Sequence, residues 1–207
     1  MIEEKPVIFV VDDDASVRKS LSRLLASHGL TVETFDSAEQ FLKREPYGGT
    51  GCIILDVRMP GLSGIALQDE LIRTGHYMPI IFITGHGDIP MSVEAMKKGA
   101  SDFLTKPFEE AQLMSAVQGA LQRSAQYRLK RTEAEELQKR IDRLTPREKE
   151  ILPYIIAGML NKQIAFKLDI AEKTIKVHRG HIMEKLGVGS VAELVRLADK
   201  ANIKPFR

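Results

Sequence analysis

The chain has 207 residues, of which 43% are hydrophobic and 28% charged, enough for one large domain or two ordinary ones. Its one cysteine, Cys52, excludes an internal disulfide and is typical of a reducing cytoplasm. The N-terminus lacks the apolar core of a signal peptide, and runs such as VIFVV and IIFI are too short to span a membrane. We therefore expect a soluble, cytoplasmic protein with no membrane partner.

The two parts of the chain differ in charge, although the net charge of the whole is only +2. Residues 1–124 contain 12 basic and 17 acidic residues, a net charge of −5, and residues 125–207 contain the remaining 18 and 11, a net charge of +7. An acidic part followed by a basic part indicates two domains with different partners. The second is a candidate for binding nucleic acid.

Short β-branched runs alternate with amphipathic segments in the first part of the chain. We expect strands at VIFVVD, LTVETF, CIILD, PIIFITG and SDFLTKPF, with a helix after each of them. Strands that alternate with helices predict a parallel sheet covered on both faces, which is a doubly wound α/β domain. In such a sheet ligands bind beyond the carboxyl ends of the strands, where the strand order reverses.

Reactive side chains follow four of these strands. They are Asp12, Asp13 and Asp14 after the first, Asp56 after the third, Thr84 after the fourth and Lys106 after the fifth. Because the carboxyl ends of parallel strands lie at one edge of the sheet, these side chains could converge there. Several carboxylates in one pocket repel each other unless a cation lies among them, and oxygen ligands favour Mg²⁺. For Asp14 alone we favour the role of a helix cap.

Asp56 is the candidate nucleophile of this group. It ends an apolar run, and the Met-Pro-Gly turn that follows leads the chain away and leaves the carboxylate open. A carboxylate beside a metal ion can accept a phosphoryl group as an aspartyl phosphate. A lysine and a hydroxyl, here Lys106 and Thr84, would stabilise the charge on the transferred group. Each side chain alone has a structural explanation, but the set at separate strand ends favours chemistry.

Four stretches resemble the receiver domain of bacterial two-component response regulators, namely VVDDDASVRKSL, ILDVRMPGLSG, IIFITGHGD and GASDFLTKPF. The resemblance covers about residues 4–123, within a domain that we place at residues 1–123, and it implies a flavodoxin-like (βα)5 fold. It implies Asp56 as the phosphoacceptor and Mg²⁺ as the cofactor. The metal ligands would be Asp12, Asp13, Asp56 and the backbone carbonyl of Arg58. Lys106 would assist, and the switch residues would be Thr84 and Phe103.

An enzyme is the alternative interpretation of the first motif. DDDASV also fits the Asp-x-Asp pattern of haloacid-dehalogenase-like phosphatases, in which Asp12 would be the nucleophile and Asp14 the general acid. Thr84 and Lys106 would then be the later elements of that family. It needs further acidic metal ligands on a strand after the lysine, however, and it leaves Asp56 unexplained. We therefore expect no enzyme, apart from catalysis of its own phosphorylation and dephosphorylation.

Residues 124–142 contain no proline or glycine and are rich in helix formers. Leu137, Ile141 and Leu144 recur at helical spacing, so we expect a mostly helical linker. We favour a solvated helix. A short coiled-coil contact is the alternative, for which the heptad pattern is brief.

Helix signals repeat over residues 143–207, the second predicted domain. LTPREKEIL opens it with a capping box from Thr145 to Glu148. The later signals are Asn161 as a cap, Gly187 as a stop, and a second capping box from Ser190 to Glu193. They predict an all-α domain of four short helices.

The stretch LTPREKEILPYIIAGMLNKQIAFKLDIAEKTIKVHRGHIMEKLGVGS resembles the LuxR/NarL-type helix-turn-helix domain of DNA-binding regulators. The resemblance implies a recognition helix, from about Lys173 to Leu186, that enters the major groove. On its outward side Lys176 can reach base acceptors, Val177 can meet a thymine methyl, and Gly180 permits close approach. The residues better placed for phosphates are Lys162, Lys173, Thr174 and Arg179.

Two residues depart from good helix formation in this domain. Pro153 lies inside its first helix, where a lost backbone bond costs around 3 kcal/mol. Ala171 stands at the N-cap of the recognition helix, where serine would be better by about 1 kcal/mol. We expect a local loss of stability and no change of fold.

The succession of receiver, helical linker and LuxR-type domain resembles the FixJ/NarL family of response regulators. ITGHGDIPMSVEAMKKGASDFLTKPF is particularly similar to the nitrogen-fixation regulators of this family. The implied partners are a histidine kinase, which is a haem-based oxygen sensor for those regulators, promoter DNA and RNA polymerase. We expect phosphorylation to produce a homodimer that binds the promoter and activates transcription.

Overall fold

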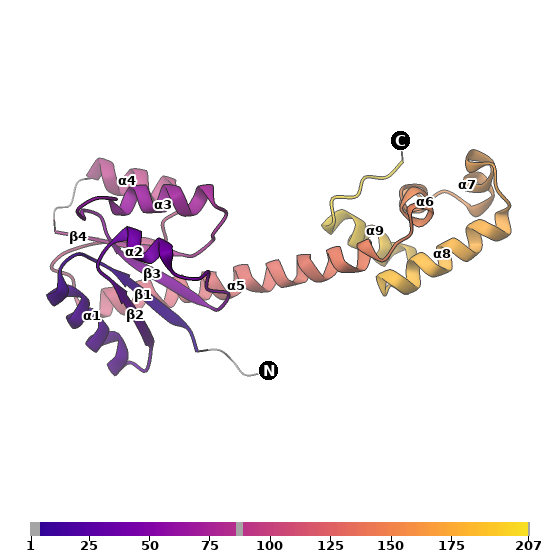
Figure 1. Cartoon of the computed structure of the whole chain (residues 1–207). Coiled ribbons are helices and arrows are strands. Elements are labelled where there is room, and N and C mark those ends of the chain that lie inside the picture. Colours follow the sequence, from indigo (N-terminus) through magenta and orange to yellow (C-terminus); the bar gives the residue numbers. More distant parts are fainter. Residues whose placement is uncertain (1–4, 86–88, 207) are drawn as a thin grey trace. The chain divides into compact units, whose positions relative to one another are not determined.

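The computed structural model describes residues 5–85 and 89–206, and it divides into two compact units, Met1–Arg128 and Leu129–Arg207 (Figure 1). Each unit has a hydrophobic core of its own. The receiver-like motif IIFITGHGD extends into residues 86–88, which lie outside the described residues.

The first unit is built on a five-stranded parallel sheet in the order β2-β1-β3-β4-β5. Its strands are β1 (Val7–Val11), β2 (Thr31–Phe35), β3 (Gly51–Asp56), β4 (Ile80–Thr84) and β5 (Asp102–Thr105). Its helices are α1 (Ala15–Ser27), α2 (Ala38–Lys43), α3 (Gly64–Arg73), α4 (Ile89–Lys97) and the start of α5 (Glu110–Asp142). The alternation of strands and helices around a parallel sheet confirms the predicted doubly wound α/β domain.

Apolar layers cover both faces of this sheet. Every residue of β1, β3 and β4 is buried, as expected for parallel strands with helices on both sides. Successive side chains alternate between the faces, so that Phe9 and Leu55 pack with α2, α3 and α4, whereas Ile8 and Ile54 pack with α1 and α5. Figure 1 shows α3 and α4 on the side of the sheet opposite α1.

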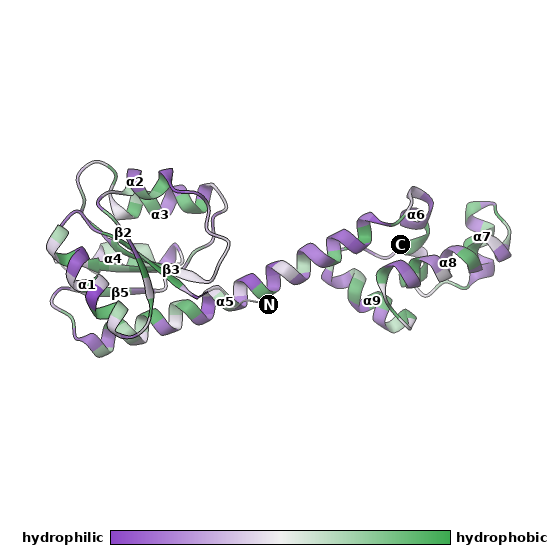
Figure 2. Ribbon diagram, turned by 60° about the horizontal axis from the view of Figure 1, so that its bottom comes forward, coloured by the Kyte–Doolittle hydropathy of each residue, from purple (hydrophilic) through white to green (hydrophobic). Residues whose placement is uncertain are grey.

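The predicted linker is continuous with the last helix of the first unit. Helix α5 runs for 33 residues because neither proline nor glycine interrupts it after Gly119. In Figure 2 its second half is mostly purple, which marks hydrophilic residues, as expected for a solvated helix. Within the described residues, no helix combines the length and the apolar character that crossing a membrane requires.

Contacts with the first unit continue beyond the predicted domain boundary at residue 123. The Ser124 hydroxyl accepts a hydrogen bond from the amide of Gly51 at 3.1 Å, and both groups are buried. The ring of Tyr127 stacks on that of Tyr77 with centroids 3.8 Å apart. These contacts explain why the first compact unit extends to Arg128.

The second unit packs four helices and the end of α5 around one core. The helices are α6 (Pro146–Ile156), α7 (Asn161–Leu168), α8 (Glu172–Leu186) and α9 (Val191–Lys200). Ile141 and Leu144, at and just after the end of α5, join this core. The prediction of a solvated linker therefore holds for most of residues 125–140 but not for Ser124 or the last turn of α5.

Two of the predicted caps differ in the structure. The capping box of Thr145 and Glu148 is present in full. Ser190 accepts a bond from the amide of Glu193, but the Glu193 carboxylate binds the amide of Gly189, so this box is only half formed. Asn161 is the first residue of α7 and does not cap it. Ala171 is the N-cap of α8 and makes no side-chain bond, as predicted.

Pro153 is accommodated by the C-terminal tail. Helix α6 continues through it, and its carbonyl accepts hydrogen bonds from the amides of Ala157 at 3.2 Å and Phe206 at 3.0 Å. The Phe206 ring stacks on Tyr154 with centroids 4.3 Å apart. These tertiary contacts offset part of the predicted local cost.

Candidate phosphoacceptor site and nucleic-acid interface

The carboxyl ends of β1 and β3 are neighbours at the point where the strand order reverses. Asp12 follows β1 and is 1% exposed, and Asp56 ends β3 and is also buried. Lys106 follows β5 and places its Nζ 2.8 Å from Asp12 Oδ2 and 2.8 Å from Asp56 Oδ1. The structure therefore brings these three predicted side chains together.

Backbone amides hold the second oxygen of each carboxylate. The amide of Asp14 donates to Asp12 Oδ1 at 2.8 Å, and that of Arg58 donates to Asp56 Oδ2 at 2.7 Å. Gly64 starts α3 so close to β3 that a Cβ there would collide with the carbonyl of Asp56. These contacts fix the orientation of both carboxylates.

The charges in this pocket do not balance. Burial raises the pKa of the Asp12 carboxyl more than its hydrogen bonds from Lys106 and the Asp14 amide lower it. Burial by itself would lower the pKa of Lys106, but hydrogen bonds to Asp12 and Asp56 outweigh it and raise this pKa, so the ammonium stays charged. Two carboxylates therefore share one cation, and the surplus negative charge favours a second one.

Asp13 and Asp14 lie outside this pair. Asp13 is exposed and makes no hydrogen bond or ion pair with any described residue. Asp14 caps α1, because its Oδ1 accepts from the amide of Ser16 at 2.7 Å and from the hydroxyl at 2.6 Å. Among residues 5–85 and 89–206, no three His, Cys, Asp or Glu side chains are grouped to hold a metal ion. Asp12 and Asp56 still suit Mg²⁺, which needs only one or two carboxylates besides water and phosphate oxygens.

The predicted switch residues lie on strands next to Lys106. Thr84 ends β4, is 2% exposed, and its carbonyl accepts a hydrogen bond from the amide of Lys106 at 2.6 Å. Phe103 lies on β5 and is half-buried, with its ring centroid 6.2 Å from that of Phe82. Thr84 and Phe103 thus lie on the two neighbouring strands beside Lys106.

An apolar surface beside Phe103 was not predicted from the sequence. A hollow of about 580 Å³ is lined there by Ser92, Val93, Met96, Lys97, Asp102 and Phe103. Val93 and Met96 of α4 are 46% and 44% exposed. The signal for it is the segment IPMSVEAM, which has more apolar residues than one buried helix face needs.

The predicted recognition helix is α8, and its outer side carries the expected contact residues. The exposed ones are Lys173, Thr174, Lys176, Val177 and Gly180. Ile175 and Ile182 are buried in the core of the second unit and hold the helix by its opposite side. Lys162, the predicted phosphate contact on α7, is also exposed.

Arg179 differs from the other predicted contacts because it is half-buried. Its Nη1 donates to Asn161 Oδ1 at 3.0 Å and so joins α8 to the start of α7. This contact uses the amide oxygen with which Asn161 was predicted to cap its helix. A guanidinium has further N–H donors, so a phosphate contact by Arg179 stays a prediction.

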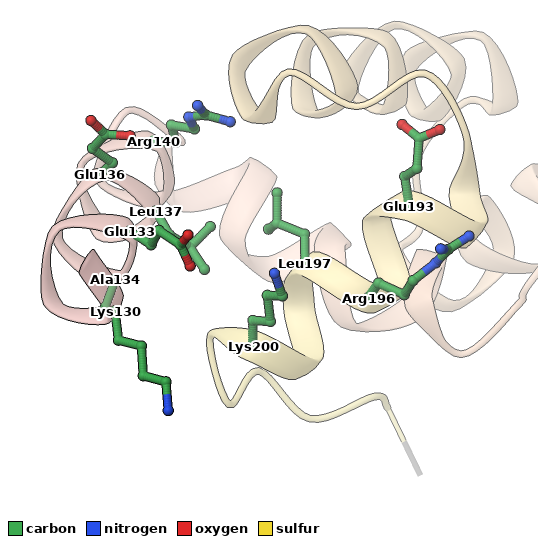
Figure 3. Close-up of a pocket in the computed structure, with 10 residues that line it drawn as sticks. All are labelled: Lys130, Glu133, Ala134, Glu136, Leu137, Arg140, Glu193, Arg196, Leu197 and Lys200. Atoms are coloured by element: carbon green, nitrogen blue, oxygen red, sulfur yellow. The ribbon is translucent and has the colours of Figure 1, made fainter. Parts of the chain in front are cut away.

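A cavity of about 630 Å³ lies in the second unit, lined by residues of α5 and α9 (Figure 3). Leu137 of α5 and Leu197 of α9 point towards each other across it. The other lining residues are Lys130, Glu133, Ala134, Glu136, Arg140, Glu193, Arg196 and Lys200. Because its rim carries charges of both signs, it shows no preference for an anion or a cation, and we assign it no ligand.

Comparison with known families gives one match for each unit. The family described as "Response regulator receiver domain" matches residues 8–118, and "Bacterial regulatory proteins, luxR family" matches residues 142–198. The chain belongs to the two-component response regulators that carry a LuxR-type DNA-binding domain. Members of this family are transcription regulators, not enzymes, and the phosphatase interpretation is therefore wrong.

Individual relatives cover nearly the whole chain. The response regulator TodT of Pseudomonas putida is 46% identical over 200 residues, 97% of this chain and 88% of its own. The transcriptional regulatory protein FixJ of Azorhizobium caulinodans is 45% identical over 205 residues, 99% of this chain and 97% of its own. The solved structure of the response regulator StyR is 52% identical, covers 95% of this chain and 100% of its own, and has a TM-score of 0.86. These values support the class without selecting one of its members.

Proposed function

We propose that this protein is a transcription activator that a histidine kinase switches on by phosphorylating Asp56. The observation that carries the proposal is that Asp12 and Asp56 share Lys106 at the switch point of the sheet. In the transfer, an Asp56 oxygen bonds to phosphorus while the bond from phosphorus to the donor histidine breaks. A regulator of promoters acts in the cytoplasm, which is where we place it.

The residues that would hold Mg²⁺ are Asp12, Asp13, Asp56 and the carbonyl of Arg58. Bound Mg²⁺ would neutralise the surplus charge of the pocket and that of the incoming phosphoryl group. Lys106 keeps its proton and donates to the phosphoryl oxygens, since its hydrogen bonds to the carboxylates raise its pKa. The Thr84 hydroxyl supplies a second donor to the same group.

Phosphorylation supplies enough free energy to change the conformation. The phosphoryl group adds about −1.5 to −2 charges at Asp56. Moving a two-state equilibrium from 1:99 to 99:1 takes about 5.5 kcal/mol of differential binding. Two or three charge-assisted hydrogen bonds, at about 1.5–3 kcal/mol each, can provide it. As Thr84 moves towards the phosphoryl group, Phe103 turns inward into the space it leaves.

The surface next to Phe103 is where we expect two phosphorylated copies to meet. Its support is the apolar hollow along α4 and β5, with Val93 and Met96 exposed. A dimer would present two α8 helices to half-sites about one DNA turn, or a multiple of it, apart. Contact with RNA polymerase would then activate transcription.

Intact-mass measurement tests the phosphoacceptor. With Mg²⁺ and a small phosphodonor such as acetyl phosphate, we expect one phosphoryl adduct on the wild type and none on Asp56→Asn. Asp14→Asn is the matched control, because this exposed cap should leave the adduct unchanged. An undiminished adduct on Asp56→Asn would exclude Asp56.

Sedimentation with and without phosphodonor tests the switch. We expect the unmodified protein to be mainly monomeric and the phosphorylated protein to dimerise. Thr84→Ala should still accept the phosphoryl group but dimerise weakly. Equal association of the wild type before and after modification would defeat the dimerisation mechanism.

Binding of duplex DNA at several salt concentrations tests the second unit. Lys176→Ala should relax base preference, whereas Lys162→Ala should weaken binding to every sequence and reduce the salt slope by about 1. Lys167→Ala is the control. The Nζ of Lys167 lies 4.9 Å over the ring of Phe206 in the C-terminal tail, so we do not expect this lysine to contact DNA. Absence of salt-dependent binding to any duplex would favour a protein partner for the basic face.

The physiological role that we propose is activation of nitrogen-fixation genes under a haem-based oxygen-sensing kinase. Its support is the stretch from the fourth predicted strand to Phe108 and the 45% identity to FixJ. The comparable identity to TodT is why the kinase must be tested directly. Oxygen-dependent phosphotransfer from a haem-containing kinase encoded beside this gene would support the role, and a neighbouring kinase without haem would contradict it.

A further inference from the structure

We propose that Arg18 is a positioning residue that holds Asp13 in the direction needed to bind the metal ion. The inference rests on the proposed function. Arg18 lies in α1, is half-buried, and its Nη1 donates to the backbone carbonyl of Asp12 at 2.7 Å. That carbonyl belongs to the peptide group that links Asp12 to Asp13, so Arg18 holds the plane of this peptide.

Asp13 depends on its backbone more than the other acidic residues of the site do. The Asp12 carboxylate is held by Lys106 and by the amide of Asp14, and that of Asp56 by Lys106 and the amide of Arg58. The Asp13 carboxylate has no partner among the described residues. The peptide that precedes it therefore sets the position from which this side chain extends.

The carbonyl of Asp12 needs a partner from outside the sheet. The paired register of β1 with β2 and β3 ends at Val11, and the helical bonds of α1 begin with the carbonyl of Asp14. The carbonyl of Asp12 therefore belongs to neither element. The long side chain of Arg18 closes this gap, and a planar guanidinium with several donors suits that task better than an ammonium does.

Removal of Arg18 should change the affinity for the metal ion in opposite directions, depending on whether the guanidinium acts through its charge or by positioning a ligand. As a charge, the guanidinium repels a divalent cation in the nearby pocket, so its loss should strengthen metal binding. As a positioning residue, it orients a ligand, so its loss should weaken metal binding. The sign of the change in affinity therefore separates the two roles.

The experiment measures Mn²⁺ binding to the full-length chain by electron paramagnetic resonance, with Mn²⁺ as the probe for Mg²⁺. We expect Arg18→Met to raise the dissociation constant roughly tenfold, as loss of an outer-shell partner does. Arg18→Lys, which keeps the charge and part of the reach, should lie between the wild type and Arg18→Met. Lys19→Met is the control, since this exposed neighbour carries the same charge, and its affinity should be unchanged or slightly higher.

A second readout separates positioning from unfolding. The rate of phosphorylation of Arg18→Met by acetyl phosphate should recover towards the wild-type rate as Mg²⁺ is raised, which a misfolded site would not do. Unchanged or tighter Mn²⁺ binding by Arg18→Met would overturn the proposal for Arg18 alone. A wild type that neither binds Mn²⁺ nor forms the Asp56 adduct would overturn the proposed function with it.

Discussion

Among residues 5–85 and 89–206, a buried carboxylate pairs with a lysine in each unit, and the two networks differ in charge balance. In the first unit, Lys106 is shared by Asp12 and Asp56. In the second, the buried Glu148 accepts from Lys185 at 2.6 Å and from the amide of Thr145 at 2.8 Å. The first network has two carboxylates and one lysine, and the second has one carboxylate and one lysine, with His181 Nδ1 3.8 Å from Glu148 Oε1.

Under the proposed function, this difference distinguishes a site that accepts a phosphoryl group from an ion pair that only stabilises the fold. The surplus carboxylate of the first unit favours a further cation, at the edge of the sheet where ligands bind. In the second unit, burial by itself would raise the pKa of Glu148, but hydrogen bonds from Lys185 and Thr145 outweigh it and lower this pKa. A buried charge whose partners are complete has no need of a ligand.

The largest expected effect is that of removing the shared cation from the first network. Lys106→Met leaves two neighbouring buried carboxylates without their ammonium, and loss of one partner of such a pair costs about 3–5 kcal/mol. We expect the free energy of unfolding of the first unit to fall by that order and to recover in part when Mg²⁺ is added. Urea denaturation with and without Mg²⁺ measures both effects.

The control for this change is Lys98→Met, which breaks a more exposed contact with Asp69 and Glu94. It should cost at most about 1 kcal/mol and show no response to Mg²⁺. If Lys106→Met responded to Mg²⁺ no more than Lys98→Met did, the first network would be structural like the second.

A change in the second network is expected to have a smaller effect on stability, and this effect depends on pH. Because folding lowers the pKa of Glu148, its contribution to stability is complete above the unfolded value of 4.5 and is lost as the pH falls through the lower folded pKa. Glu148→Gln should destabilise α6 at neutral pH by about 1–2 kcal/mol, through the weakened capping box. This substitution should also remove the loss of stability at acidic pH.

Hydrogen exchange of the α6 amides in the full-length protein, measured between neutral and acidic pH, follows this change. Glu150→Gln is the matched control, because this carboxylate is exposed and, among the described residues, pairs with Arg147 alone, on the same helix. Equal pH dependence of α6 in the wild type and in Glu148→Gln would show that the network adds no stability.

The smallest expected effect comes from adding the helix cap that the second unit lacks. Ala171→Ser supplies the missing N-cap of α8 and should stabilise the second unit by about 1 kcal/mol. Thermal unfolding of the full-length protein should show a higher midpoint for the second unit and an unchanged one for the first. A lower midpoint for the second unit of the Ala171→Ser variant would mean that the new hydroxyl finds no amide to bind.

Much of the fold could be predicted because its signals are local. Five apolar runs with helical segments between them imply parallel strands. Because parallel strands end on the same side, the carboxyl ends of β1, β3 and β5 could be predicted to lie at one edge of the sheet. The capping box of Thr145 and Glu148 acts over three residues, and it formed as predicted. The box at Ser190 formed only by half, because the Glu193 side chain could reach either of two neighbouring amides.

The sequence by itself determined the doubly wound sheet, the convergence of Asp12, Asp56 and Lys106, and an α8 helix with an exposed basic side. These follow from periodicity and strand direction, which depend on residues close together in the chain. Only the tertiary structure decided that Asp13 stays outside the carboxylate pair, that Ser124 binds the amide of Gly51, and that Phe206 supports the helix containing Pro153. The last two contacts join groups 73 and 53 residues apart in the chain, and Asp13 is placed by a turn between a strand and a helix. In each case the choice depends on which groups packing brings within hydrogen-bonding distance, and no local pattern encodes that distance.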